Sequence, residues 1–319
     1  MGIEHIVYGP VPSRRLGYSL GINNIPPKKC SYSCVYCQVG NTLDMRVERE
    51  NFYKSGDIAQ AVREKVSQLK EKEEPIDYLT FVPDGEPTLD VNLGQEIELL
   101  KPLGIKIAVI TNASLIWRED VRQDLQKADW VSLKVDSVSE EIWRRVNRPK
   151  KSLKLGAIFD GMLKFASIFS GELAIESMLI QGINDSGEEI EKIAGFLAGL
   201  KPKVAYLAIP TRPPAKRGIR AASEPVVNMA YQIFNRRLSG VEYLIGYEGN
   251  EFALTGKLED DLLSITSVHP MREEAVTEFL RKADAGWEVI ERLIREGSLV
   301  ELEYQEKKFY MRKLPGDRR

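Results

Sequence analysis

The cysteines of this 319-residue chain constrain it more than any other feature, because all three lie within eight residues. They are Cys30, Cys34 and Cys37, and they follow the spacing C-x3-C-x2-C with a tyrosine before the last cysteine. Three thiolates on one short loop can hold three irons of a cubane cluster. The fourth iron then has no protein ligand and stays open to another molecule.

Two simpler explanations of these cysteines are a structural zinc site and a disulfide. A structural zinc site usually has four closed ligands, and the only histidines that could supply the fourth are the distant His5 and His269. A disulfide would be strained in so tight a loop and is uncommon in cytosolic proteins. Ordinary ferredoxin-type ligation needs four cysteines for each cluster. The loop therefore predicts one cubane cluster with one open iron.

Strand-like and helix-like segments alternate along most of the chain, which predicts an α/β fold. Apolar strand-like runs lie near residues 19–22, 78–82, 105–110, 130–135, 173–180 and 204–209. Strands separated by helices form right-handed βαβ units and a parallel sheet. Six such units predict a partial (β/α) barrel rather than a closed eight-unit barrel. Its active site should lie at the C-terminal ends of the strands.

The chain changes character after residue 250, and a second, smaller domain is expected there. Residues 1–250 would form the partial barrel. Residues 257–319 contain three helical patterns followed by two strand-like runs, which favours a winged-helix-like module. Because this segment is slightly acidic, we expect it to dock a substrate or to pack on the barrel rather than to bind DNA phosphates.

Motifs at the predicted strand ends agree with the cysteine loop, and together they resemble the radical S-adenosylmethionine (SAM) superfamily. Asp84-Gly85-Glu86 follows the second strand and resembles the Gly-Gly-Glu motif of that superfamily, with aspartate in place of the first glycine. Thr111-Asn112 ends the third strand, and Ser132-Leu133-Lys134 ends the fourth. The resemblance implies the same six-unit partial barrel, a 4Fe–4S cluster on the three cysteines, and SAM at the open iron.

The resemblance also assigns contacts to SAM. The residues expected to make them are Tyr36, Gly85, Glu86, Asn112, Ser132, Lys134, Glu176 and Met178. Glu86 and Lys134 would hold the amino-acid end of SAM. Ser132 and Glu176 would face its ribose. A lysine inside an apolar strand needs a partner, so Lys134 could instead pair with Asp136.

The run at residues 9–22 and the loop at Arg212-Pro213-Pro214 resemble a group of archaeal and bacterial proteins related to wyosine synthetases. True tRNA wyosine synthetases carry a second cluster on additional cysteines, and this chain has none to spare. Their reaction on tRNA is therefore not expected here. Arg14, Arg15 and Arg212 could hold an anionic substrate bidentately, or they could form internal salt bridges.

The resemblance implies a radical enzyme. The reduced cluster would pass one electron to SAM, giving methionine and a 5′-deoxyadenosyl radical that abstracts hydrogen from a substrate. An external one-electron donor of the flavodoxin or ferredoxin type would supply that electron. The substrate could be RNA, tRNA or a protein docked by the C-terminal module, or a small anionic metabolite with that module structural. A non-catalytic SAM sensor is a third alternative.

The amino-acid composition indicates which kinds of binding partner to expect. The chain is 43% hydrophobic and 29% charged with a net charge of −2, which is typical of a soluble globular protein. This net charge does not indicate nucleic-acid binding. No apolar run approaches the roughly 18 residues of a membrane span. The first residues do not resemble a signal peptide, so we expect a cytoplasmic protein without a membrane partner.

Overall fold

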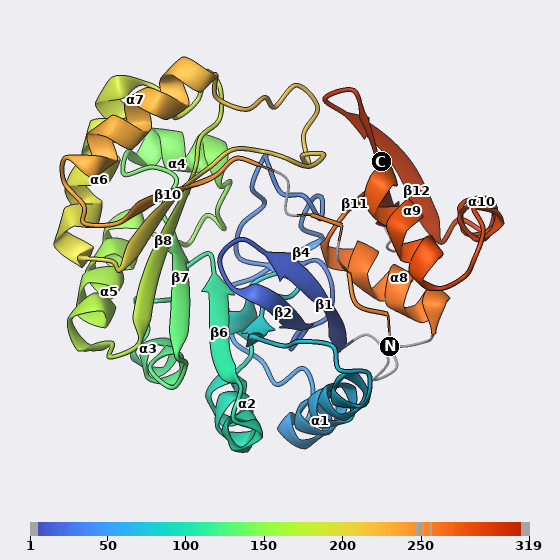
Figure 1. Cartoon of the computed structure of the whole chain (residues 1–319). Helices are drawn as coiled ribbons and strands as arrows, with labels where there is room; N and C mark the ends of the chain where they lie inside the picture. Colours follow the sequence, from blue (N-terminus) through green and yellow to red (C-terminus); the bar gives the residue numbers. More distant parts are fainter. Residues whose placement is uncertain (1–5, 247–248, 251, 255–256, 314–319) are drawn as a thin grey trace.

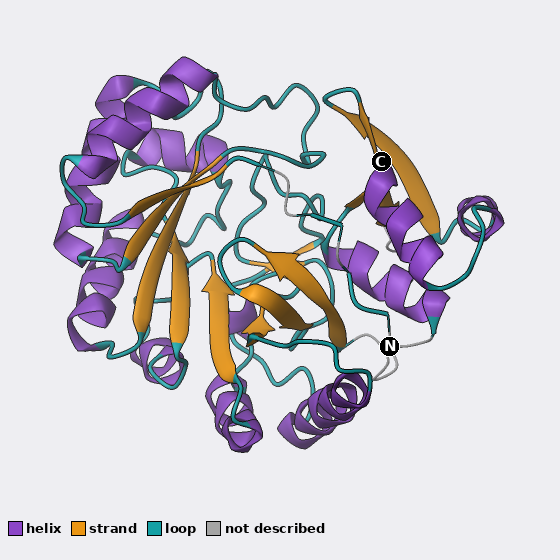
Figure 2. Ribbon diagram, viewed as in Figure 1, coloured by secondary structure: helices purple, strands orange, loops and turns teal. Residues whose placement is uncertain are grey.

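The barrel is an open, curled sheet with helices on its outer side. The computed structural model describes residues 6–246, 249–250, 252–254 and 257–313. Within them, the main sheet has the spatial order β1 (Val7–Ser13), β2 (Gly17–Ile22), β5 (Tyr78–Phe81), β6 (Lys106–Thr111), β7 (Trp130–Lys134), β8 (Glu172–Met178), β9 (Val204–Ala208) and β10 (Val241–Leu244). β1 runs antiparallel to β2, and the other neighbours are parallel (Figures 1 and 2).

Helices follow the strands in the βαβ order that the sequence predicted. They are α1 (Ser55–Glu71), η2 (Pro87–Leu89), α2 (Leu93–Leu100), η3 (Lys101–Leu103), α3 (Glu119–Leu125), α4 (Glu140–Val146), α5 (Leu155–Ile168), α6 (Gly187–Leu200) and α7 (Glu224–Asn235). α1–α3 and α5–α7 lie around the outside of the curled sheet (Figure 1). None of the helices in the described residues combines the length and the hydropathy needed to cross a bilayer.

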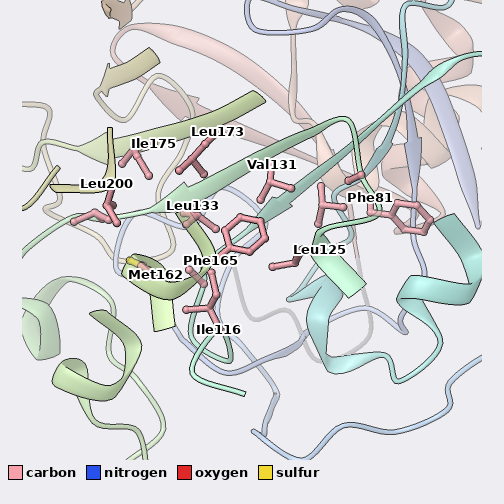
Figure 3. Close-up of a cluster of buried hydrophobic side chains, with 14 of the residues drawn as sticks. Phe81, Ile116, Leu125, Val131, Leu133, Met162, Phe165, Leu173, Ile175 and Leu200 are labelled. Atoms are coloured by element: carbon pink, nitrogen blue, oxygen red, sulfur yellow. The ribbon is translucent and has the colours of Figure 1, made fainter. Parts of the chain in front are cut away.

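The main hydrophobic core lies between the sheet and these helices (Figure 3). Val131 and Leu133 of β7 and Ile175 of β8 point outward, where they belong to the same buried cluster as Met162 and Phe165 of α5. The intervening residues of the same strands point to the inner face. Both faces of the central strands are thus buried, which is usual for parallel sheets and explains their nearly continuous apolar runs.

The predicted α/β partial barrel is confirmed, and two further strands extend it. β10 continues the parallel sheet beyond β9, and β1 adds an antiparallel edge beyond β2. β10 has only four residues, and Glu242 and Tyr243 in its centre are exposed, so its sequence gives a weak strand signal. The β1–β2 turn places Leu16 on the inner face of the sheet, against Trp130 and Tyr206.

The C-terminal segment packs against the barrel through β1. Its elements are α8 (Leu258–Val268), β11 (Met271–Arg272), α9 (Glu273–Lys282), α10 (Glu288–Arg295), β12 (Leu299–Tyr304) and β13 (Lys307–Arg312). The three strands form a sheet of order β11-β13-β12. Tyr8 and Val11 of β1 share one buried cluster with Leu262, Ile265 and Phe279. The expected helices and hairpin are present, while a separate winged-helix-like domain stays a prediction.

Candidate functional site

A cavity of about 340 Å³ lies where the parallel strands end, and it brings almost all of the predicted site residues together. Its lining includes Arg14, Arg15, Cys30, Cys34, Tyr36, Cys37, Gly85, Asn112, Ser132, Lys134, Glu176, Met178 and Arg212. Glu86 is the one predicted residue outside this lining, within the part of the chain that the structure describes. The site therefore forms at the expected edge of the sheet.

The cysteine loop is positioned by backbone hydrogen bonds to the segment that ends α4. Val35 N donates to Val146 O at 2.9 Å, and Ser33 N donates to Asn147 O at 3.1 Å. At its start, β3 (Lys29–Cys30) pairs with β4 (Asp44–Met45). All three cysteines are partly exposed and unbridged, so the disulfide alternative is not what this loop adopts.

Side-chain amides face two of the three sulfurs. Asn112 Nδ2 donates to Cys30 Sγ at 3.4 Å, and Asn147 Nδ2 donates to Cys34 Sγ at 3.5 Å. Although these residues are partly exposed, the surrounding protein desolvates their thiols. This desolvation, reinforced by nearby carboxylates, raises the pKa of Cys34 to about 12 and that of Cys30 well above its usual value. Thiolates here need a bound cation to stabilise them, which iron would supply.

The donor set fits a cluster better than a single metal ion. Three unbridged thiols line one cavity, and amide donors face two of their sulfurs, as donors do in iron–sulfur proteins. A structural zinc site would need a fourth ligand as well, because three thiols alone do not complete its coordination. Cys30, Cys34 and Cys37 are therefore the residues that would hold the cluster.

Lys134 lies in a network of charged side chains on the inner face of β7 and β8. Its ammonium contacts the Glu176 carboxylate, lies 3.9 Å from Asp136 Oδ1, and sits 5.0 Å from the centre of the Tyr36 ring. Arg15 contacts the other oxygen of Glu176. Burial lowers the pKa of Lys134, but Glu176 and Asp136 outweigh it, so that the pKa lies above its usual value. Of the two roles predicted for Arg15, the structure shows the internal salt bridge.

Asp136 connects the cysteine loop to β8 and was considered in the sequence only as a partner of Lys134. It is buried and accepts hydrogen bonds from the Tyr36 hydroxyl, from Asn147 Nδ2 at 2.6 Å and from Met178 N at 2.8 Å. Its place directly after a strand was a visible signal. No sequence pattern pointed to Asn147, because its contacts with Cys34 and Asp136 form only in the folded protein.

Glu86 organises the ends of β5 and β6 instead of lining the cavity. Its buried carboxylate accepts hydrogen bonds from Thr111 Oγ1 at 2.6 Å, from Thr88 Oγ1 at 2.6 Å and from Asn112 N at 2.8 Å. Burial raises the pKa of Glu86, and the bonds from Thr111 and Thr88 oppose this shift. In this arrangement Glu86 positions Asn112, and its contact with SAM stays a prediction.

Gly85→Ala is expected to displace the start of the cysteine loop. A Cβ at Gly85 would lie 2.0 Å from the Lys29 carbonyl oxygen, next to Cys30. Overpacking of this kind lowers the free energy of unfolding by about 1–3 kcal/mol, and the iron content per chain should fall with it. Gly195→Ala is the matched control, because nothing lies within 4 Å of its Cβ position. In helix α6 this change should stabilise the protein by about 0.8–1 kcal/mol. Urea unfolding that shows the same sign for both variants would contradict the prediction.

Arg212 lies on the loop after β9 and connects it to the C-terminal segment. Arg212 Nη1 donates to Gln38 Oε1 at 2.6 Å, and Arg212 Nη2 lies 3.0 Å from His269 Nε2. Gln38 Nε2 in turn donates to Val268 O at 3.1 Å. Val268 and His269 line the cavity, so the C-terminal segment forms part of its wall.

Comparisons with known proteins identify relatives of this chain. The model of the family described as "Radical SAM superfamily" matches residues 24–197. The UPF0026 protein MJ1312 of Methanocaldococcus jannaschii is 50% identical over 311 residues, which cover 97% of this chain and 96% of that protein.

Two solved structures share the fold at low sequence identity. A radical SAM methyltransferase from Sphaerobacter thermophilus has a TM-score of 0.54 and 14% identity, over 71% of this chain and 66% of that one. The structure of TYW1 with a lysine–pyruvate adduct has a TM-score of 0.51 and 15% identity, over 70% of this chain and 76% of that one. The family model covers more than half of the chain, and members of this family use a 4Fe–4S cluster and SAM. The chain belongs to the radical SAM superfamily, as its cysteine loop predicted.

Proposed function

We propose that this protein applies SAM-derived radical chemistry to a small substrate that carries an anionic group. When bound and reduced, the cluster supplies the electron that splits SAM into methionine and a 5′-deoxyadenosyl radical, which takes a hydrogen atom from the substrate. The residues of the chain bind and orient SAM and substrate and keep water away from the radical. The observation that carries the proposal is the charge of the cavity wall.

The cavity has more cationic than anionic side chains. Among the described lining residues, the cations are Arg14, Arg15, Lys28, Lys134 and Arg212, and the carboxylates are Asp84 and Glu176. A 4Fe–4S cluster held by three thiolates would carry a small net negative charge, which the positive sulfonium of SAM would offset at least in part. A surplus of positive charge in a concave, partly enclosed site attracts an anionic ligand. Arg14 and Arg212 would bind the anionic group of such a ligand.

The shape of the site favours a small substrate over RNA or protein. The C-terminal segment closes one side of the cavity through Val268 and His269 and is held there by β1. Tyr304 OH also donates to Pro210 O at 3.0 Å, on the loop that carries Arg212. A cavity of about 340 Å³ is near the lower end of the range for ligand pockets, which is about 300–1,000 Å³. Of the alternatives left open by the sequence, we propose the small anionic metabolite, with the C-terminal segment as a wall.

The electron has to come from another protein. The three cysteines of the chain are all needed for one cluster, so none is left for a second cluster that could relay electrons. Radical SAM enzymes generally depend on an external donor. We propose a flavodoxin-type or ferredoxin-type protein as that donor.

The proposed function is tested with anaerobically reconstituted protein, dithionite and SAM, with 5′-deoxyadenosine as the measured product. A slow reaction is expected without substrate. Fractions of small anionic metabolites, separated by anion exchange, should accelerate it, whereas total RNA and protein fractions should not. Acceleration by RNA or protein alone would select the polymer class. An iron-loaded protein that does not cleave SAM would contradict the radical function.

Lys134→Met is expected to weaken SAM binding about tenfold or more. Loss of one charge-assisted hydrogen bond costs about 1.5–3 kcal/mol, and about 1.4 kcal/mol corresponds to tenfold in affinity. Isothermal titration with SAM measures the change. Lys154→Met is the control, because Lys154 is exposed and does not line the cavity. Unchanged SAM affinity in a folded Lys134→Met variant would remove this residue from the SAM site.

A further inference from the structure

We infer that Lys28, paired with Asp84, forms a substrate subsite that binds an oxyanion, either a carboxylate or a phosphate group. This inference deepens the proposed function and rests on it. No motif of the cysteine loop or of the SAM contacts includes Lys28. Asp84 drew attention only because it replaces a glycine.

The pair is fixed by the backbone at one side of the cavity. Lys28 lies just before β3, and Asp84 lies just after β5. Lys28 N donates to Asp84 O at 2.8 Å, and Lys28 Nζ lies 3.3 Å from Asp84 Oδ2. Their side chains are 5% and 4% exposed, and both residues line the cavity. The ammonium is therefore held in place before any ligand arrives.

The hydrogen-bonding capacity of this ammonium is not met by the protein. In the part of the chain that the structure describes, Lys28 Nζ has no correctly directed hydrogen-bond partner, although it is buried. An ammonium has three donors, and leaving them unmet away from water is unfavourable. Lys28 also has a φ of 64°, a left-handed conformation that non-glycine residues seldom adopt and that is concentrated at functional sites. Oxygen atoms of a ligand in the cavity would satisfy these donors.

The order of strands separates this pair from Lys134 and Glu176, two of the residues assigned to SAM. Lys28 and Asp84 follow the neighbouring strands β2 and β5, whereas Lys134 and Glu176 lie on β7 and β8, with β6 between the two groups. The Lys28 side also carries a pair of hydroxyls that line the cavity. They are Ser19 Oγ and Thr80 Oγ1, which lie 2.7 Å apart. This side offers polar contacts for a second ligand beside SAM.

An oxyanion fits the cavity because of the charge of its wall. Lys28 and Asp84 balance one another, so the pair alone would not favour an anion. Arg14 and Arg212 line the same cavity and supply the additional positive charge. An oxyanion would accept hydrogen bonds from Lys28 and be balanced by these arginines, as charge-assisted hydrogen bonds require.

The test measures thermal unfolding of the cluster-loaded protein under anaerobic conditions. Inorganic phosphate and succinate are titrated separately at constant ionic strength with chloride as the control salt, and SAM is titrated in a parallel series. A ligand that binds the folded state raises the melting temperature with its concentration. Phosphate and succinate distinguish the two kinds of oxyanion. Iron content is measured for each variant, because Lys28 lies close to Cys30.

The subsite predicts opposite losses for variants on the two sides of the cavity. Lys28→Met should require about tenfold more anion for the same stabilisation and should bind SAM as the wild type does. Lys28→Met/Asp84→Asn should behave in the same way without leaving a buried carboxylate unbalanced. Lys28→Arg should keep most of the anion effect. Lys134→Met should keep the anion effect and lose SAM affinity.

Three outcomes would overturn the subsite. The first is a wild-type protein that neither phosphate nor succinate stabilises. The second is an unchanged anion response in both the Lys28→Met and the double variant. The third is a loss of SAM affinity in these variants, which would place Lys28 in the SAM site instead. A wild-type protein that does not bind or cleave SAM would refute the proposed function itself, which is a different result.

Discussion

Cys34→Ala is expected to abolish cluster assembly and reductive SAM cleavage. The chain contains three cysteines, all on the loop that lines the cavity, so the loss of one leaves two ligands and no cysteine to replace it. Two thiolates do not hold a cubane cluster with one open iron. Iron and sulfide analysis, electron paramagnetic resonance and 5′-deoxyadenosine production should therefore all fall to background.

Ser33→Ala is the matched control for Cys34→Ala. Ser33 is the neighbouring residue, and the bond that positions the loop uses its backbone N–H, which alanine keeps. Its side chain accepts a long hydrogen bond of 3.4 Å from Thr42 N, so a small effect is expected. A Cys34→Ala variant with full iron content and wild-type SAM cleavage would show that the cluster is not held by this loop.

Glu176→Ala is expected to lower the free energy of unfolding by about 3 kcal/mol and to weaken SAM binding. The Glu176 carboxylate contacts both Arg15 and Lys134, and these side chains are 12%, 19% and 15% exposed, respectively. Removal of one partner of a buried ion pair costs about 3–5 kcal/mol, because the remaining charge loses its compensation. Because these side chains are partly exposed, we expect a cost at the lower end of this range. Urea unfolding and SAM titration measure the two effects.

Glu188→Ala is the control for Glu176→Ala. Glu188 forms an ion pair with Lys192 on the surface of α6, where its side chain is 80% exposed. Such pairs contribute about 0–1 kcal/mol, so little change is expected. Adding Lys134→Met to Glu176→Ala should restore part of the stability, because it removes one of the uncompensated cations. Equal stability of Glu176→Ala and Glu188→Ala would contradict the network.

Much of the fold was predictable because parallel strands are recognisable locally. Each central strand is buried on both faces, so its sequence is a short apolar run, and the polar residue after the run falls at the same edge of the sheet. The same reasoning predicted that Asn112, Lys134 and Met178 lie close together, and the structure places all three in the wall of one cavity. This reasoning gives a position along a strand but not the direction of a side chain. The orientation of Glu86 was therefore not predictable, since its carboxylate is held by Thr111 on the next strand.

The parts that could not be predicted depend on pairs of residues far apart in the chain. The contact between Lys28 and Asp84 joins two loops, and the sequence of neither loop indicates that it contacts the other. One signal was nevertheless visible, because an aspartate in place of a motif glycine puts a charge into a buried site that requires a balancing charge. His269 had no such signal. It reaches the cavity only because α8 packs on β1, an apolar contact that many hydrophobic residues could have made.

Gln38 directly follows Cys37 and makes hydrogen bonds both to Arg212 and to the carbonyl of Val268 at the end of α8. The cysteine loop and the wall that closes the cavity are thus joined at one side chain, although they lie at opposite ends of the chain. A chain emerges from the ribosome with its N-terminal part first. The loop and the half-barrel can therefore form while the closing segment is still being made. We therefore expect the cavity to stay open to incoming iron and sulfide until the C-terminal segment packs against β1.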